Sequence, residues 1–204
     1  MTMQGPAVLV LGAGRGKRMG RPKLLLPFRG STFLERIFCR CREAGAAVTL
    51  TVSPELRGRA EAAVAALPPP PPRLVQVAGD LPMLAAVQAG LAGGDFSDGF
   101  WLWPVDAPFL SAAGWSTALA AAGAEPGAVW KLSAGGRTGH PVWFPAWSVP
   151  KILAGGWSDG LLGLLKQSAG KIRVLALEGE ELRDFNTRAE LAGARPAPGA
   201  EPKP

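Results

Sequence analysis

Residues 7–23 read AVLVLGAGRGKRMGRPK, and this stretch decides how the chain begins to fold. Ala7–Leu11 is an uninterrupted apolar run, which is typical of a central strand buried on both faces of a sheet. Glycines then recur at positions 12, 14, 16 and 20, interleaved with basic residues. The stretch therefore predicts a buried strand followed at once by a glycine-rich, cationic loop.

This loop has the composition of a polyphosphate-binding site. Glycines permit positive φ and let the backbone approach a ligand closely. Successive backbone N–H groups in such a loop form a concavity for anions, and Arg and Lys side chains add charge-assisted hydrogen bonds to phosphate oxygens. The basic residues of the loop are Arg15, Lys17, Arg18, Arg21 and Lys23.

Two familiar glycine motifs do not fit the loop. A Walker loop requires Gly-x-x-x-x-Gly-Lys-Ser/Thr, but Gly16-Lys17 is followed by Arg18 and preceded five residues earlier by Leu11. A dinucleotide fingerprint requires a third glycine where Lys17 stands. The remaining pattern is Gly-x-Gly-x-x-x-Arg-Met-Gly-x-Pro-Lys, directly after a strand.

The rest of the chain alternates strands with helices, which predicts an α/β fold: a single domain with a doubly wound, mostly parallel sheet. Expected strands cover 48–52, 74–77, 100–105, 128–132, 141–144 and 172–177, and expected helices cover 31–44, 83–91, 111–122, 160–167 and 188–191. Ser53-Pro54-Glu55 should open another helix, and Pro68–Pro72 should be a surface connection. We expect a flexible N-terminus at 1–6, the domain at 7–193 and a disordered tail at 194–204.

Asp106 ends the expected strand at 100–105 and is followed by Ala107-Pro108. Ligands of open α/β sheets bind beyond the carboxyl ends of the strands, where the strand order reverses. The glycine loop and Asp106 should meet there. Mg²⁺ takes one or two protein carboxylates together with substrate phosphates, so Asp106 is a candidate magnesium ligand.

Composition narrows the possible functions. The net charge is +6 with 22 Lys and Arg, which favours acidic partners. Concentration of this charge in one loop favours a compact triphosphate over a nucleic acid, although a basic nucleic-acid binder stays an alternative. Cys39 and Cys41 should point in different directions on a helix and form neither a disulfide nor a metal pair. We find no signal peptide or membrane span and expect a soluble, cytoplasmic protein.

The loop, extended by Leu24-Leu25-Leu26-Pro27 and Gly30, resembles the nucleotidyltransferases of molybdenum cofactor biosynthesis. These MobA/MocA-like NTP transferases have a nucleotide-diphospho-sugar-transferase-like fold. The resemblance implies magnesium-dependent transfer of CMP from CTP to molybdopterin, with release of pyrophosphate. Transfer of GMP from GTP is the second choice. A molybdoenzyme or its chaperone would be a possible protein partner, with no role for nucleic acid or membrane.

Residue roles follow from the same resemblance. It implies catalytic roles for Lys23, Arg18 and Asp106, and metal binding by Asp106 and Asn186, the latter within Asp184-Phe185-Asn186-Thr187. Residues 136–144 resemble the cytidylyltransferase branch of the family. The nucleotide would contact Leu11, Gly12, Ala13, Gly14, Arg15, Gly16 and Lys23, and the acceptor would contact Arg137, Gly139 and His140.

The sequence departs from the family pattern in two places. Gly12 stands where alanine is usual. Three serines of a family segment are Leu84, Ala85 and Ala86 here, so the hydrogen bonds implied for their hydroxyls cannot form. A nucleotide-binding module without turnover is therefore an alternative, as is a sugar-phosphate or other small-phosphate nucleotidyltransferase.

Overall fold

The computed structural model describes residues 5–14, 16, 20–28, 30–178, 182, 184, 185 and 190. Several expectations lie outside these ranges. They are the roles of Arg15, Arg18 and Asn186, most of the helix expected at 188–191, most of the N-terminal segment and the tail from 194.

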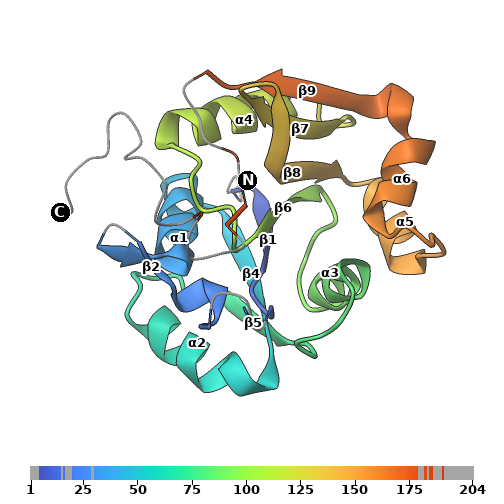
Figure 1. Ribbon diagram of the computed structural model, residues 1–204. Helices are drawn as coiled ribbons and strands as arrows, with labels where there is room; N and C mark the ends of the chain where they lie inside the picture. Colours follow the sequence, from blue (N-terminus) through green and yellow to red (C-terminus); the bar gives the residue numbers. More distant parts are fainter. Residues whose placement is uncertain are drawn as a thin grey trace.

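A seven-stranded sheet runs through the centre of the molecule (Figure 1). Its order across the sheet is β5 (Arg73–Gln76), β4 (Ala47–Val52), β1 (Ala7–Leu11), β6 (Gly99–Pro104), β8 (Arg137–Pro145), β7 (Val129–Ala134) and β9 (Ile172–Ala176). Only β8 pairs antiparallel with its neighbours; the other described pairs of this sheet are parallel. The predicted mostly parallel α/β sheet is confirmed.

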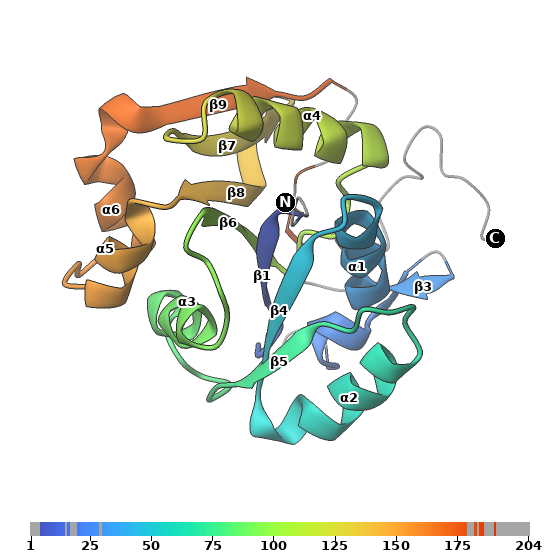
Figure 2. The same ribbon diagram turned by 180° about the vertical axis from the view of Figure 1, so that it is seen from behind.

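Helices cover both faces of the sheet, as Figures 1 and 2 show from opposite sides. They are α1 (Phe33–Glu43), α2 (Arg57–Ala65), α3 (Met83–Ala92), α4 (Ala112–Ala124), α5 (Ser148–Ala154) and α6 (Leu161–Gln167). Short 3-10 helices cover Lys23–Leu25, Pro54–Leu56 and Ala169–Lys171, and a small hairpin pairs β2 (Pro27–Phe28) with β3 (Ser31–Thr32).

The central strand shows why a continuous apolar run was needed. Val8 and Val10 are buried in the core cluster shared with α1, α2 and α4. Leu9, pointing to the opposite face, is buried in the cluster shared with α3, α5 and α6. Side chains alternate across a strand, so a strand covered on both sides must be apolar at every position.

Three local expectations needed correction. The helix expected from 31 begins at Phe33, because Thr32 forms a capping box with Glu35 and β3 precedes it. Ser53 does not cap the following helix with its side chain, and a 3-10 turn intervenes before α2. Helix α5 was not predicted, because its 7 residues are fewer than the roughly 11–18 over which a helical period is judged, and Pro150 stands in its first turn.

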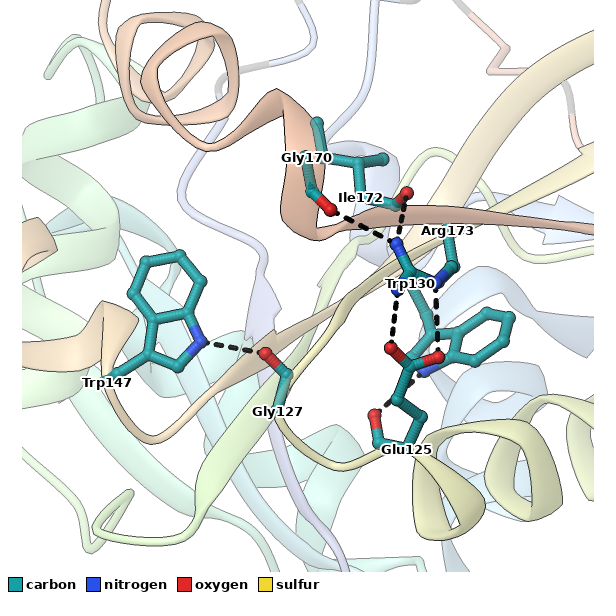
Figure 3. Close-up of polar contacts among 7 residues, drawn as sticks. All are labelled: Glu125, Gly127, Trp130, Trp147, Gly170, Ile172 and Arg173. Atoms are coloured by element: carbon teal, nitrogen blue, oxygen red, sulfur yellow. Dashed lines mark hydrogen bonds and ion pairs between the residues drawn. The ribbon is translucent and has the colours of Figure 1, made fainter.

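Side-chain contacts fasten α4 to the outer strands at one edge of the molecule (Figure 3). Glu125 accepts two hydrogen bonds from Arg173 of β9, at 2.7 and 3.1 Å. The indole of Trp130 donates to the Glu125 carbonyl at 3.2 Å, and that of Trp147 donates to the Gly127 carbonyl at 2.8 Å.

Within the described ranges, no helix has both the length and the apolarity required to span a membrane.

Candidate functional site

The glycine loop and Asp106 leave the sheet side by side. Strand β1 lies between β4 and β6, so the strand order reverses at β1 and β6. Leu11 and Pro104 are paired at the carboxyl ends of these strands, and the Val105 N–H donates to the Leu11 carbonyl at 3.1 Å. The sheet itself therefore holds the glycine loop beside the segment of Asp106, although Lys23 and Asp106 are 83 residues apart in the sequence.

Gly12 and Gly16 are required by close backbone contacts. The Gly12 N–H donates to the Thr51 carbonyl at 3.0 Å, and a Cβ at Gly12 would lie 3.0 Å from that oxygen and 2.9 Å from Leu50 Cδ1. The glycine that departs from the family pattern therefore has a packing reason. Gly16 has φ of +59°, and a Cβ there would collide with the Arg21 carbonyl, so the loop folds back on itself only with glycine.

Lys23 reaches Asp106 across the mouth of the site. The Lys23 Nζ lies 2.7 Å from Asp106 Oδ2, and the two side chains are 16% and 24% exposed. Lys23 begins the 3-10 helix Lys23–Leu25, whose Leu24 is fully buried and fixes the turn against the core. A cation and a carboxylate that remain reachable from solvent, beside a glycine loop, can bind a phosphate and a divalent metal respectively.

The backbone of Asp106 is fixed on several sides. The Ala107 N–H donates to the Pro104 carbonyl at 3.2 Å, which closes a turn around Asp106. The buried indole of Trp103 donates to the Ala107 carbonyl at 2.8 Å. The Phe185 N–H donates to the Asp106 carbonyl at 3.0 Å. The carboxylate is therefore presented from a rigid frame.

The contact with Phe185 brings a second carboxylate, Asp184, to the site. Phe185 is fully buried, and its ring lies 4.5 Å from that of Phe109. Leu182 is buried directly over Gly139, where any Cβ would collide with the Leu182 carbonyl. Asp184 lies between these two anchors. The motif Asp184-Phe185-Asn186-Thr187 led us to assign metal binding to Asn186. Spacing alone does not say which side chain of the motif faces the cavity, and the structure shows that Asp184 lines it.

Electrostatics couple Asp184 to His140 and Asp106. Burial of its carboxyl, followed by repulsion from Asp106, raises the pKa of Asp184, and His140 and Lys23 oppose that rise. Burial lowers the pKa of His140 despite attraction from Asp184 and Asp106. The imidazole is therefore neutral at pH 7, and its Nδ1 is buried without a hydrogen-bond partner in the described part of the chain.

These residues suit a magnesium ion bound together with a nucleotide. Two carboxylates that repel each other are the hard oxygen donors Mg²⁺ prefers, and a cation between them would relieve the repulsion. Among the described residues no group of three or more His, Cys, Asp or Glu side chains could hold a metal. A resident all-protein metal cage is not seen there; Mg²⁺ commonly relies on one or two carboxylates and substrate phosphates.

Two neighbouring cavities open at this edge of the sheet. The first, of about 570 Å³, is lined by Leu11, Ala13, Gly14, Gly16, Lys23, Thr51, Ala78, Gly79, Asp80, Leu81, Met83, Ala86, Pro104, Val105, Asp106, His140 and Asp184. The second, of about 280 Å³, is lined by Met83, Leu102, Lys131, Thr138, Gly139, His140, Val142, Phe144, Leu161, Leu162, Leu165, Leu182 and Asp184. Met83, His140 and Asp184 line both, so the cavities adjoin.

The expected contact residues divide between these cavities. Of the expected nucleotide contacts that the structure describes, Leu11, Ala13, Gly14, Gly16 and Lys23 line the first cavity, while Gly12 is buried behind it. Gly139 and His140 line the second. Arg137 is exposed at the end of the β7–β8 hairpin and is not among the residues that line either cavity. Ala86 faces the first cavity, whereas Leu84 packs against the core.

Comparisons with known proteins agree with this geometry. Residues 8–172 match the model of the family described as the MobA-like NTP transferase domain. A molybdenum cofactor guanylyltransferase from Xanthomonas euvesicatoria is 34% identical over 116 residues. That match covers 55% of this chain and 53% of the relative, so it spans about half the length of each.

Solved structures share the fold over almost the whole chain. The Rv0371c protein of Mycobacterium tuberculosis H37Rv is 26% identical with a TM-score of 0.75, covering 92% of this chain and 96% of that one. A complex of the same protein with manganese has a TM-score of 0.70 at 24% identity, covering 93% and 100%. A nucleotidyl transferase from Methanothermobacter has a TM-score of 0.71 at 23% identity, covering 92% and 94%.

The family match over residues 8–172, the fold shared with the solved structures and a cavity that joins the glycine loop to Asp106 lead to one assignment: this chain belongs to the MobA-like NTP transferase family.

Proposed function

We propose that the protein transfers a nucleoside monophosphate from GTP or CTP to molybdopterin, with Mg²⁺, and releases pyrophosphate. The observation that carries this proposal is the Lys23–Asp106 pair at 2.7 Å, at the point where the glycine loop enters the larger cavity. The family match and the guanylyltransferase relative support the reaction type and the acceptor.

The reaction needs positioning and charge stabilisation more than covalent chemistry. An oxygen of the acceptor phosphate forms a bond to the α-phosphorus of the NTP. The bond from that phosphorus to the oxygen bridging toward the β-phosphate breaks, and its electron pair leaves with pyrophosphate. A bound Mg²⁺ would supply positive charge next to the transferring phosphoryl group.

The residues of this chain would divide the work. Backbone N–H groups of the loop at 13–16 would bind the phosphates, while the Gly12 N–H holds the loop to the Thr51 carbonyl. Lys23 would exchange Asp106 for phosphate oxygens and stabilise the negative charge that develops during transfer. Asp106 and Asp184 would hold the metal, and Arg18 and Asn186 remain proposed contributors. A phosphate monoester is already largely dianionic at pH 7, because its second pKa is about 6, so the neutral His140 is not needed to ionise it.

For the base we place GTP before CTP. Asp80 lines the larger cavity beyond the loop, and its carboxylate accepts hydrogen bonds but donates none. Guanine presents two adjacent N–H donors that one carboxylate can accept together, whereas cytosine presents a single amino group. Of the three positions without a serine hydroxyl, Leu84 packs against the core, whereas Ala86 lines the larger cavity and offers no hydrogen bond to a base there.

The test is incubation of the protein with each NTP, Mg²⁺ and molybdopterin, measuring pyrophosphate and the mass of the product. The melting temperature with each NTP and Mg²⁺ reports binding separately. We expect pyrophosphate release when the NTP is GTP or CTP, and none with the other nucleotides. Stabilisation by NTP without pyrophosphate would instead support a binding module, and turnover only with sugar phosphates would support the other acceptor class.

A further inference from the structure

The second cavity, which we name the acceptor chamber, differs in chemistry from the first. Most of its wall is apolar: Met83, Leu102, Val142, Phe144, Leu161, Leu162, Leu165 and Leu182. Its side-chain polar groups are Lys131, Thr138, His140 and Asp184. Because His140 and Asp184 also line the first cavity, a ligand in the chamber would face the α-phosphate position near Asp106.

An irregularity in the sheet places Lys131 and His140 together. Lys131 pairs with Val142, but the next residue of β7, Leu132, pairs with Gly139, so His140 and Pro141 are extra on β8. Such bulges re-aim side chains at the edges of sites, and Pro141 has no N–H to keep the ladder regular. The bulge therefore brings one cation and one imidazole to the same chamber.

Lys131 differs from Lys23 and Lys166, which both form ion pairs with aspartates. Lys23 pairs with Asp106 at 2.7 Å and Lys166 with Asp159 at 2.6 Å. In the part of the chain that the structure describes, no carboxylate lies within ion-pair distance of Lys131, although its side chain borders an apolar wall. A half-buried ammonium without a fixed partner is well suited to bind an anionic or electron-rich group of a ligand.

The apolar wall limits the body of that ligand. The chamber volume of about 280 Å³ is at the small end of ligand sites, which span roughly 300–1,000 Å³. Three leucines of α6 and Phe144 offer surface that favours the faces of a ring system. A sugar would bury several hydroxyls there, and hydroxyls without hydrogen-bond partners lose affinity.

We propose that Lys131 and the α6 leucines determine the acceptor: a phosphate monoester whose body is a flat ring system with a second electron-rich or anionic group, and not a polyhydroxylated sugar phosphate. This proposal rests on the proposed function and names the residues that select its second substrate. Lys131 takes the second group of the acceptor, and the leucines cover the ring. Arg137, which the sequence had placed among the acceptor contacts, does not line the chamber.

The experiment measures direct binding, so that it does not depend on turnover. Neopterin 3′-monophosphate, which is fluorescent, is titrated into the protein with Mg²⁺ and a non-hydrolysable GTP analogue, and glucose 1-phosphate is added as competitor. The variants are Lys131→Met, Lys131→Arg and Leu162→Asn. Leu162 is 52% exposed, so its substitution leaves the core intact. The matched controls are Lys166→Met and Leu153→Asn, the latter at a leucine 45% exposed on α5 outside the chamber.

We expect Lys131→Met to raise the Kd of the probe by about 10-fold or more, the scale of a lost charge-assisted hydrogen bond. Leu162→Asn should raise it about 3–10-fold, Lys131→Arg should retain most of the affinity, and the controls should match the wild type. Glucose 1-phosphate should not compete. Equal competition, no probe binding to the wild type, or unchanged binding in Lys131→Met would overturn the proposal.

Failure of the proposed function has a different signature. If no NTP raised the melting temperature and no acceptor gave pyrophosphate, the nucleotidyltransferase assignment of the site would fail as a whole. If NTP bound normally and pyrophosphate formed with a sugar phosphate, only the acceptor chamber proposal would be lost. The melting shift with NTP should be the same in every chamber variant, because Lys131 and Leu162 are not among the described residues that line the first cavity.

Discussion

The two adjoining cavities are built from different parts of the protein. The wall of the larger one includes much backbone from small residues, such as Ala13, Gly14 and Gly79, with Lys23 and Asp106 at one end. The acceptor chamber is walled by leucines, a valine and a phenylalanine. Phosphates are recognised by N–H groups and cations in fixed positions, whereas a ring is recognised by the shape of apolar side chains. The surface proposed for the chemistry and the surface proposed for acceptor selectivity are therefore lined largely by different residues.

The largest expected effect concerns the charges of the first cavity. Lys23→Ala and Asp106→Asn should each lower kcat/KM by at least about 10²-fold, because each removes a preorganised charge that acts on the reacting phosphate. Lys166→Ala and Asp159→Asn are matched controls, since they break an exposed Lys–Asp pair at 2.6 Å. Steady-state kinetics by pyrophosphate release measure the difference. Near-normal activity of either first-cavity variant would refute its role.

The next effect tests whether the backbone shape of the loop matters. Gly16→Ala places a Cβ against the Arg21 carbonyl at a φ of +59°, so the loop must open. We expect the Kd for NTP to rise about 10-fold, in line with the roughly 1–3 kcal/mol of strain at such positions. Gly58→Ala on α2 is the control, because nothing lies within 4 Å of its added Cβ and Gly58 lines neither cavity. Equal NTP affinities, measured calorimetrically, would show that loop curvature is unimportant.

A smaller effect should follow from loosening the frame around Asp106. Trp103→Phe removes the indole N–H that donates to the Ala107 carbonyl at 2.8 Å. An unsatisfied buried carbonyl costs about 1–3 kcal/mol of unfolding free energy, and kcat should fall several-fold with little change in the NTP KM. Trp130→Phe removes a similar bond at the exposed edge in Figure 3 and should leave kcat unchanged. Urea unfolding and kinetics report the two quantities; equal kcat in both variants would contradict a positioning role for Trp103.

The smallest effect concerns Asp184 in the metal-free protein. Burial and repulsion from Asp106 raise the pKa of Asp184, so its ionised form destabilises the fold at neutral pH. Asp184→Asn should then raise the Tm at pH 8 in EDTA by only about 1 °C, because solvent screens a partly exposed carboxylate. The gain should disappear as the pH falls through the raised pKa and the wild-type carboxyl becomes protonated. With Mn²⁺ and NTP the order should reverse, since the variant loses a metal ligand; a Tm difference that is independent of pH and metal would contradict this account.

Much of the fold was predictable from local patterns. The run Ala7–Leu11 indicated a doubly covered central strand, and its alternate burial in two core clusters confirms this. Cys39 and Cys41 point apart as expected, one exposed and one buried. Helix α5 escaped prediction because its 7 residues make too short a segment to establish a helical period. The roles of Arg18 and Asn186 remain predictions.

Sequence patterns could indicate the acceptor side of the site only in outline. Gly139 and His140 do line the acceptor chamber, but Arg137, two positions before Gly139, lies exposed at the hairpin end. Lys131 carried no signal of its own, and the motif that contains Asp184 directed the metal role to Asn186 instead. Side chains along a strand point alternately to the two faces of the sheet, so the register shift between Lys131 and Leu132 changes which side chains face the cavity. The spacing of residues in the sequence does not reveal such a bulge.

The sequence by itself determined that a buried strand ends in a cationic glycine loop and that a second strand ends in a carboxylate, because apolar runs, glycines and charges act locally. The predicted strand order also implied that the glycine loop and Asp106 would meet. Only the tertiary structure decided that Lys23 makes the contact with Asp106, that Asp184 joins them and that Lys131 borders the neighbouring chamber. These contacts join residues far apart in the chain, and they arise from strand order, sheet register and the packing of Leu182 and Phe185, which no short stretch of sequence encodes.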